Sequence, residues 1–232
     1  MTYKHKAGMA AFLATALGVA AQNPTASKHP KVQPGPNEPD WVDLLDKRYH
    51  LDMEKDLLNP QEGEIQNVRA LFEKAGPGAV TFAPEIALGL EVAIHGGFYL
   101  AGTQPEPALT ELWSYQHKST TAQVESGEDL TPPLKPSSST EFDPGDKPFG
   151  LYVENDEFHD RVYTEPVRVS TLNPRLAKQP YKVMIYPYRD RTTGKLVPNT
   201  YLIGWEYSTN DDFQDVVCRI GNVKLLKPES KP

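Results

Sequence analysis

From residue 79 onward, apolar residues recur at every second position of the chain. Over residues 85–102, alternating positions are apolar, namely Ile86, Leu88, Leu90, Val92 and Ile94. An alternation of period two predicts a strand with one buried face. Further strands are expected at 98–102, 111–115, 149–154, 161–165, 181–188, 199–208 and 215–226, with a hairpin turn at Gly194. Many short strands separated by turn residues predict a mainly β fold, an antiparallel β-sandwich of jelly-roll or immunoglobulin-like type over residues 79–232.

Residues 40–78, which precede the strands, have helical spacing instead. One helix is expected after Asp40, a good N-cap, with Trp41 and Leu44 on one side. A second helix is expected between Asn59 and Gly76, with a capping box and an apolar stripe formed by Asn59, Pro60, Glu62, Ile65, Val68, Leu71 and Phe72. The pattern therefore predicts a short N-terminal helical extension that docks on the β-sandwich.

The first 39 residues have the composition of an export signal and a tether. Lys4 and Lys6 precede an apolar run from Ala7 to Ala21, and small residues allow cleavage before Gln22. Residues 1–21 are thus expected to be a signal peptide; an uncleaved membrane anchor and a buried helix are the alternatives. Residues 22–39 contain five prolines and few apolar residues, which is typical of a semi-extended tether. The protein is therefore expected in the periplasm or outside the cell.

One long segment inside the β-sandwich, residues 118–148, is polar and has little to bury. A loop of this length in a compact domain is either functional or mobile. The chain has 232 residues and a formal charge of −7, and no basic block offers a phosphate-binding face. This charge distribution argues against nucleic acid as a partner. The single cysteine, Cys218, shares a predicted strand face with Val216 and Ile220, so we expect a buried thiol.

Sequence motifs of common enzyme classes are absent from the chain. It has no G-x-S-x-G, H-E-x-x-H, P-loop or G-x-G-x-x-G motif, and no two of its six histidines have metal-ligand spacing. A glycosidase carboxylate pair is not recognisable from sequence, because that chemistry depends on the distance between two carboxylates. A non-catalytic protein is favoured, with a hydrolase acting on sugars as the weaker alternative.

Four aromatic residues near charged positions raise the possibility of sugar binding. They are Trp113, Tyr115, Trp205 and Tyr207. Trp205 and Tyr207 are two residues apart and share one strand face. Such rings either stack on the apolar faces of sugars or fill the protein core, and the sequence leaves both alternatives open.

The segment 206–215, which we call the acidic loop, is rich in oxygen ligands. The candidate calcium ligands are Glu206, Asn210, Asp212 and Asp215, while Phe213 is expected to anchor the loop in the core. Calcium binds several carboxylate and carbonyl oxygens at once. The alternative is a metal-free turn in which Asn and Asp side chains bind backbone N–H groups.

The acidic loop also resembles the C-terminal signature of an uncharacterised β-sandwich domain of bacterial secreted and cell-surface proteins. That signature is F-E-D followed by D-x-D-[FY]-N-D, and here Glu206, Asp212 and Asp215 match its carboxylates, while Asn210 and Gln214 replace more usual residues. The resemblance covers roughly residues 95–226. It implies a non-catalytic extracytoplasmic module with calcium in the acidic loop, and the replacements imply a weaker calcium affinity.

These patterns together lead to one main functional expectation. It is a non-catalytic exported binding or scaffolding protein, an accessory subunit with protein partners in a larger extracytoplasmic or membrane-bound assembly. The alternative is a calcium-assisted carbohydrate-binding module that uses the four aromatic rings beside the acidic loop.

Overall fold

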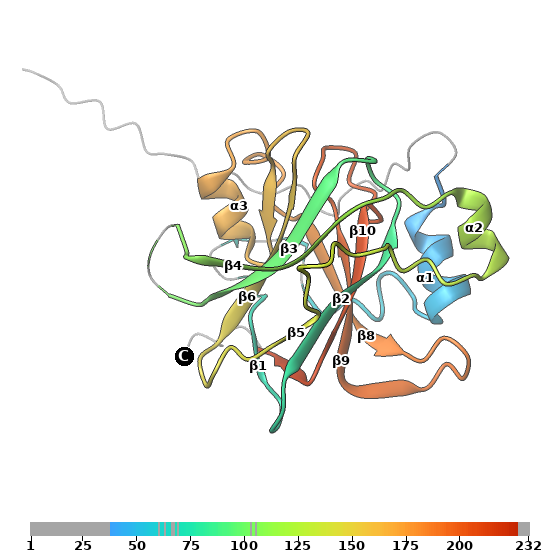
Figure 1. Cartoon of the computed structure of the whole chain (residues 1–232), viewed down its shortest axis with the longest axis horizontal. Helices are drawn as coiled ribbons and strands as arrows, with labels where there is room; N and C mark the ends of the chain where they lie inside the picture. The colour runs from blue at the N-terminus through green and yellow to red at the C-terminus, as the bar shows by residue number, and fades with distance from the viewer. Residues whose placement is uncertain are drawn as a thin grey trace, which may run out of the picture.

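Eleven strands form two antiparallel sheets in the part of the chain described by the computed structural model (Figure 1). That part is residues 38–226 without residues 60, 63, 66, 67, 69, 103 and 105. The expected signal peptide or anchor at 1–21, and residues 22–37 of the expected tether, lie outside it. Among the described residues, no helix has the length and apolar character needed to cross a membrane.

The two sheets pack face to face, which confirms the mainly β fold and the antiparallel sandwich. The six-stranded sheet has the order β11 (Val223–Leu225), β1 (Phe72–Lys74), β6 (Phe149–Asn155), β3 (Ala93–Leu100), β4 (Leu109–Gln116), with β7 (Arg161–Tyr163) also paired to β6. The five-stranded sheet has the order β5 (Glu141–Phe142), β2 (Val80–Ala87), β10 (Val216–Gly221), β9 (Leu196–Trp205), β8 (Val183–Arg189). The helices are α1 (Trp41–Tyr49), α2 (Thr121–Ser126) and α3 (Pro166–Leu172).

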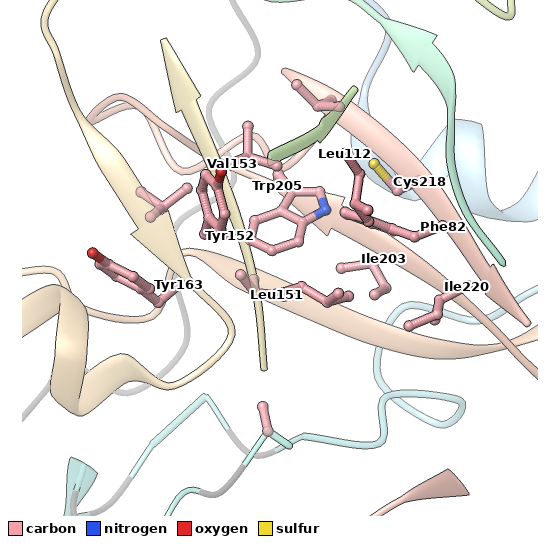
Figure 2. Close-up of a cluster of buried hydrophobic side chains, with 14 of the residues drawn as sticks. Phe82, Leu112, Leu151, Tyr152, Val153, Tyr163, Ile203, Trp205, Cys218 and Ile220 are labelled. Carbon is pink, nitrogen blue, oxygen red and sulfur yellow. The ribbon is translucent and has the colours of Figure 1, made fainter. Parts of the chain in front are cut away.

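The main core lies between the sheets and is filled by alternate residues of their strands. Cys218 and Ile220 of β10 point toward Leu151 of the other sheet, with Phe82 and Trp205 around them (Figure 2). Because side chains alternate along a strand, these positions share one face. Cys218 is fully buried, and burial raises the pKa of its thiol well above the usual value. The prediction of a buried thiol is confirmed.

Helix α1 covers the outer face of the five-stranded sheet. Asp40 caps the helix by accepting a hydrogen bond from the Val42 backbone N–H at 2.8 Å. Trp41 lies directly on β9, because a Cβ atom at Gly204 would be only 2.6 Å from its ring. The helix and this face of the sheet form a second core cluster that also contains Leu44, Leu45, Tyr49, Met184, Tyr186, Leu202, Phe213 and Val217. The five-stranded sheet is therefore buried on both faces, and the prediction of the first helix is confirmed.

The prediction of a second helix between Asn59 and Gly76 is wrong. Phe72 begins strand β1, and no described residue of 61–71 belongs to an α-helix. The amide of Asn59, the expected helix cap, instead binds the exposed edge of β8: it accepts from the Ile185 N–H and donates to the Val183 carbonyl, both at 2.8 Å. Edge strands leave backbone groups unpaired, and pairing them here outweighs the local helix propensity.

The long apolar alternation around residue 90 does not form one strand. Strand β2 ends at Ala87 and β3 begins at Ala93, and the two strands lie in different sheets. Between them, the backbone N–H groups of Leu88 and Gly89 both donate to the carbonyl of Asp215, at 3.1 Å. The connection between the sheets is thus held against the acidic loop.

The segment 118–148 is more ordered than its polar composition indicates. It contains α2, which has a capping box between Thr120 and Gln123, and strand β5, which pairs with β2. Leu130 and Phe142 are buried. The expectation that this loop has little to bury is wrong, because its few apolar residues lie where the segment passes over the core.

Candidate metal centre

The acidic loop connects two neighbouring strands of the five-stranded sheet. Strand β9 ends at Trp205 and β10 begins at Val216, and these two residues are paired across the ladder. Glu206 and Asp215 follow and precede this pair, so they lie at the same end of the sheet. An additional bridge joins Trp205 to Gln214. Strand pairing alone therefore brings together carboxylates that are nine positions apart in sequence.

Three of the four predicted metal ligands converge in a buried cluster. One carboxylate oxygen from each of Glu206, Asp212 and Asp215 lies within 4.8 Å of the other two. The residues are only 0%, 1% and 8% exposed, respectively. Backbone N–H groups bind some of the oxygens: Asp212 donates to Glu206 Oε2 at 2.9 Å, and Tyr207 donates to Asp215 Oδ2 at 3.0 Å. The Ser208 N–H also donates to Glu206 Oε1, so both oxygens of Glu206 are bonded, whereas Asp212 Oδ1 has no hydrogen-bond partner and is open to a ligand.

The backbone of the loop is strained and is held by two anchors. Asp211 and Phe213 have φ angles of 54° and 55°, a left-handed conformation that is rare for residues with side chains. The Phe213 ring is fully buried in the cluster beneath α1. The Asp211 carboxylate forms a 2.7 Å ion pair with Lys182, whose side chain is fully buried. Lys182 is therefore committed to Asp211, and the ion pair and the buried ring hold the two residues that flank Asp212.

Several buried polar atoms around the cluster lack hydrogen-bond partners. They are Asp212 Oδ1, Asn210 Oδ1, Gln214 Oε1 and Gln214 Nε2. Asn210, the fourth predicted ligand, uses its amide nitrogen to donate to the other oxygen of Asp212. Gln214 is 1% exposed, and neither of its amide atoms has a hydrogen-bond partner. Buried polar groups are nearly always satisfied, so these oxygens are available to a bound cation or to ordered water.

Burial and mutual repulsion make the cluster a poor place for three bare negative charges. Burial, followed by the charges of Glu206 and Glu38, raises the pKa of Asp212 to about 7. Burial and the charge of Glu206 also raise the pKa of Asp215 well above its usual value. Carboxylates in such a site either take up protons or share a cation.

The residues present fit a calcium ion. Three carboxylates converge, the amide oxygens of Asn210 and Gln214 in the same loop have no hydrogen-bond partner, and calcium takes about six to eight oxygens at about 2.3–2.6 Å. Two oxygens on opposite sides of one such ion are about 5 Å apart, so carboxylate oxygens that all lie within 4.8 Å of one another are close enough to share one ion. Magnesium usually keeps several waters and is held by one or two carboxylates, so a buried site rich in protein oxygens favours calcium.

The four predicted aromatic ligands are core residues, and the prediction that they form a ligand platform is wrong. Trp113 and Trp205 are fully buried, and Tyr115 and Tyr207 are 1% exposed. Figure 2 shows Trp205 enclosed between side chains of both sheets. The two-residue spacing did place Trp205 and Tyr207 on one face, but that face is the one between the sheets. No sugar can stack on these rings while the fold is intact.

Three residues of the site were not among the sequence-predicted ligands. Glu38 belongs to the expected tether, and its proximity to Asp212 depends on where α1 docks. Lys182 is far away in sequence, and only strand pairing brings it to the loop. Gln214 was visible as the replacement of Asn in the resemblance, and its position beside two acidic residues was the one available signal.

Known proteins provide no assignment for this site. No protein-family model, no curated protein and no solved structure matches the chain. Function has to be inferred from the residues and their geometry alone.

Proposed function

We propose that this protein is a non-catalytic binding module that holds Ca²⁺ in the acidic loop. The observation that carries the proposal is the convergence of three buried carboxylates in a loop whose amide oxygens have no hydrogen-bond partner. A divalent cation neutralises most of the charge of the triad and supplies a partner for these oxygens. The chemistry it contributes is electrostatic cross-linking.

In this proposal, the position of the loop lets the cation stabilise the arrangement of the elements that meet there. Glu206 follows β9 and Asp215 precedes β10, so an ion between them ties the ends of two strands. Phe213 extends from the same loop into the cluster beneath α1. The Asp215 carbonyl also accepts the N–H groups of Leu88 and Gly89 in the connection between the sheets. Calcium would thus fix the relative positions of both sheets and α1.

Calorimetric titration of calcium into EDTA-treated full-length protein tests the proposal. We expect one ion per chain with a dissociation constant between about 10⁻⁵ and 10⁻³ M, weak because two ligands are neutral amides. Asp212→Asn keeps the shape of the side chain and should weaken binding at least about tenfold, since it removes one charge from the ion. Asp190→Asn, in the exposed β8–β9 turn, is the matched control and should bind normally. The absence of calcium heat and of any calcium-dependent melting shift in the unmodified protein would refute the proposal.

We also propose that the module works outside the cytoplasm as an accessory subunit. This is supported by the Lys4–Ala21 export pattern and by the proline-rich segment that follows it. Weak calcium sites suit extracellular fluids, where calcium is abundant. Mass spectrometry of the protein from its native cell fractions should show a mature chain that starts near Gln22, together with stable partners after mild detergent extraction. A full-length chain confined to the cytosol without partners would contradict this.

A further inference from the structure

A pocket of about 510 Å³ lies where the N-terminal ends of α1 and α2 meet. Its walls include Glu38, which precedes α1, and Lys118, which precedes α2, and the two helices lie next to each other in Figure 1. Leu88 forms another part of the wall, and its backbone N–H donates to the carbonyl of Asp215 at 3.1 Å. The pocket therefore adjoins the acidic loop.

Glu38 brings a carboxylate to this pocket from outside the acidic loop. Its Oε1 binds the Lys118 ammonium at 3.2 Å, and the side chains of Glu38 and Lys118 are 20% and 42% exposed, respectively. An ion pair that is partly in solvent contributes little to stability. The charge of Glu38 also acts on the triad, because it is the next cause, after burial and Glu206, that raises the pKa of Asp212. Glu38 thus lies between an exposed lysine and the buried carboxylates.

Two cations already contact the acidic loop, but neither is paired with the triad. Lys182 forms its ion pair with Asp211 at 2.7 Å. Arg175 donates to the Tyr207 carbonyl at 3.4 Å, and its ion pair is with Asp160. A calcium ion in the triad would therefore attract Glu38 with two charges, against the single charge of Lys118.

Calcium in the triad would also need oxygens beyond those of the loop. The ion takes about six to eight oxygens, some of them through a bound water, and both oxygens of Glu206 already accept backbone N–H groups. We propose that Glu38 is a further carboxylate of the calcium site: when calcium binds, Glu38 exchanges the Lys118 ammonium for the ion, directly or through a water, and Lys118 moves into solvent. This inference rests on the proposed function, and it makes calcium a link between the acidic loop and the start of α1.

Calorimetric titration of calcium into EDTA-treated full-length protein, at constant ionic strength, tests the exchange. Glu38→Gln removes the charge but keeps the shape of the side chain, and should weaken calcium binding about 3- to 10-fold. Lys118→Met removes the competing cation and should strengthen binding about 2- to 5-fold. Glu91→Gln is the matched control, because Glu91 is exposed and lines the same pocket. It should keep the affinity within about twofold, since solvent screens its charge.

The double variant Glu38→Gln/Lys118→Met separates an exchange of partners from a general effect of charge. Without Glu38 there is no carboxylate for Lys118 to withhold from the ion, so Lys118→Met should change the affinity less than about twofold in this background. Additive effects of the two substitutions would overturn the inference, because they would mean that each charge acts on the ion separately.

Melting temperatures in EDTA distinguish the exchange from a purely structural ion pair. Glu38→Gln removes a negative charge that faces the triad and should raise the melting temperature, whereas Lys118→Met leaves that charge unpaired and should lower it. A lower melting temperature for both variants would show a structural ion pair and overturn the inference. Normal calcium binding by the unmodified protein with unchanged affinity in Glu38→Gln would overturn it too, while leaving the proposed function intact. Absence of calcium binding in the unmodified protein would refute both.

Discussion

Two polar connections in the same sheet use similar residues with opposite results. The turn between β8 and β9 contains Asp190, whose carboxylate accepts hydrogen bonds from the N–H and hydroxyl groups of Thr193 at 2.8 and 2.7 Å. Its left-handed position, with φ of 66°, is occupied by Gly194. The side chains around it are exposed or half-buried. The polar groups of this turn form hydrogen bonds either within the turn or with solvent.

The acidic loop between β9 and β10 lacks each of these advantages. Its left-handed positions are occupied by Asp211 and Phe213 instead of glycine. Its carboxylates are buried, and several of its oxygens have no hydrogen-bond partner. The presence of Asp and Asn in a loop therefore does not by itself distinguish a self-sufficient turn from a loop with buried, unpaired carboxylate oxygens. Solvent and glycine make a polar turn independent, whereas burial without glycine makes it depend on anchors and, in the function that we propose, on a bound ion.

Among the variants considered, removal of the aromatic anchor of the acidic loop should have the largest effect on the free energy of unfolding. Phe213→Ala deletes a fully buried ring and should lower the free energy of unfolding by about 4 kcal/mol. Leu196→Ala in β9, next to the exposed turn, removes a side chain that is 56% exposed and should change it by less than about 0.5 kcal/mol. Urea unfolding followed by tryptophan fluorescence measures both. A similar loss in the two variants would mean that the acidic loop needs no anchor.

Breaking the buried ion pair should be the next largest effect. Asp211→Ala leaves the Lys182 charge buried without a partner and should destabilise the protein by about 3 kcal/mol. The double variant Lys182→Met/Asp211→Ala removes both charges and should recover part of this loss. A double-mutant cycle from urea unfolding gives the coupling energy. Additive effects would contradict the direct pairing of the two residues.

The pH dependence of stability should distinguish the buried carboxylates from ordinary ones. Because the folded-state pKa of Asp212 is raised to about 7, its contribution is full below pH 4 and is lost as pH rises through 7. In EDTA, the protein should lose about 2 kcal/mol between pH 5 and pH 8. Calcium binds the deprotonated carboxylates, so the stabilisation that it provides should grow over the same range.

Asp212→Asn is the control for this pH dependence, since it removes one titrating group and should reduce the slope in EDTA, with the remainder contributed by Asp215. Denaturant unfolding at several pH values, with and without calcium, provides the measurement. An identical slope in both proteins would assign the effect to other groups.

The smallest effect is expected in the exposed turn. Asp190→Ala removes two hydrogen bonds at the surface and should lower the free energy of unfolding by about 0.5–1 kcal/mol. Calcium affinity should stay the same, because the turn and the acidic loop share no residues. A large loss of stability or of calcium binding would show that the two connections are coupled.

Strand periodicity and turn residues were sufficient to predict the sandwich and the burial of Cys218. The capping residue Asp40 was sufficient to predict the start of α1. The predicted helix between Asn59 and Gly76 failed although its local signals were good. Asn59 instead forms hydrogen bonds with the edge of β8, and Phe72 pairs with other strands as part of β1. Both interactions depend on partners more than 70 positions away, and the local spacing of residues carries no information about such partners.

By itself the sequence determined which residues offer ligands in the acidic loop, because residue type and the β9–β10 spacing are local properties. Only the tertiary structure decided that the carboxylates are buried and converge, and that Trp205 and Tyr207 face the core. Only the fold placed Lys182 and Glu38 beside the loop. The physical reason is that burial and electrostatic pairing depend on distances between remote segments, and those distances are set by sheet pairing and by the docking of α1.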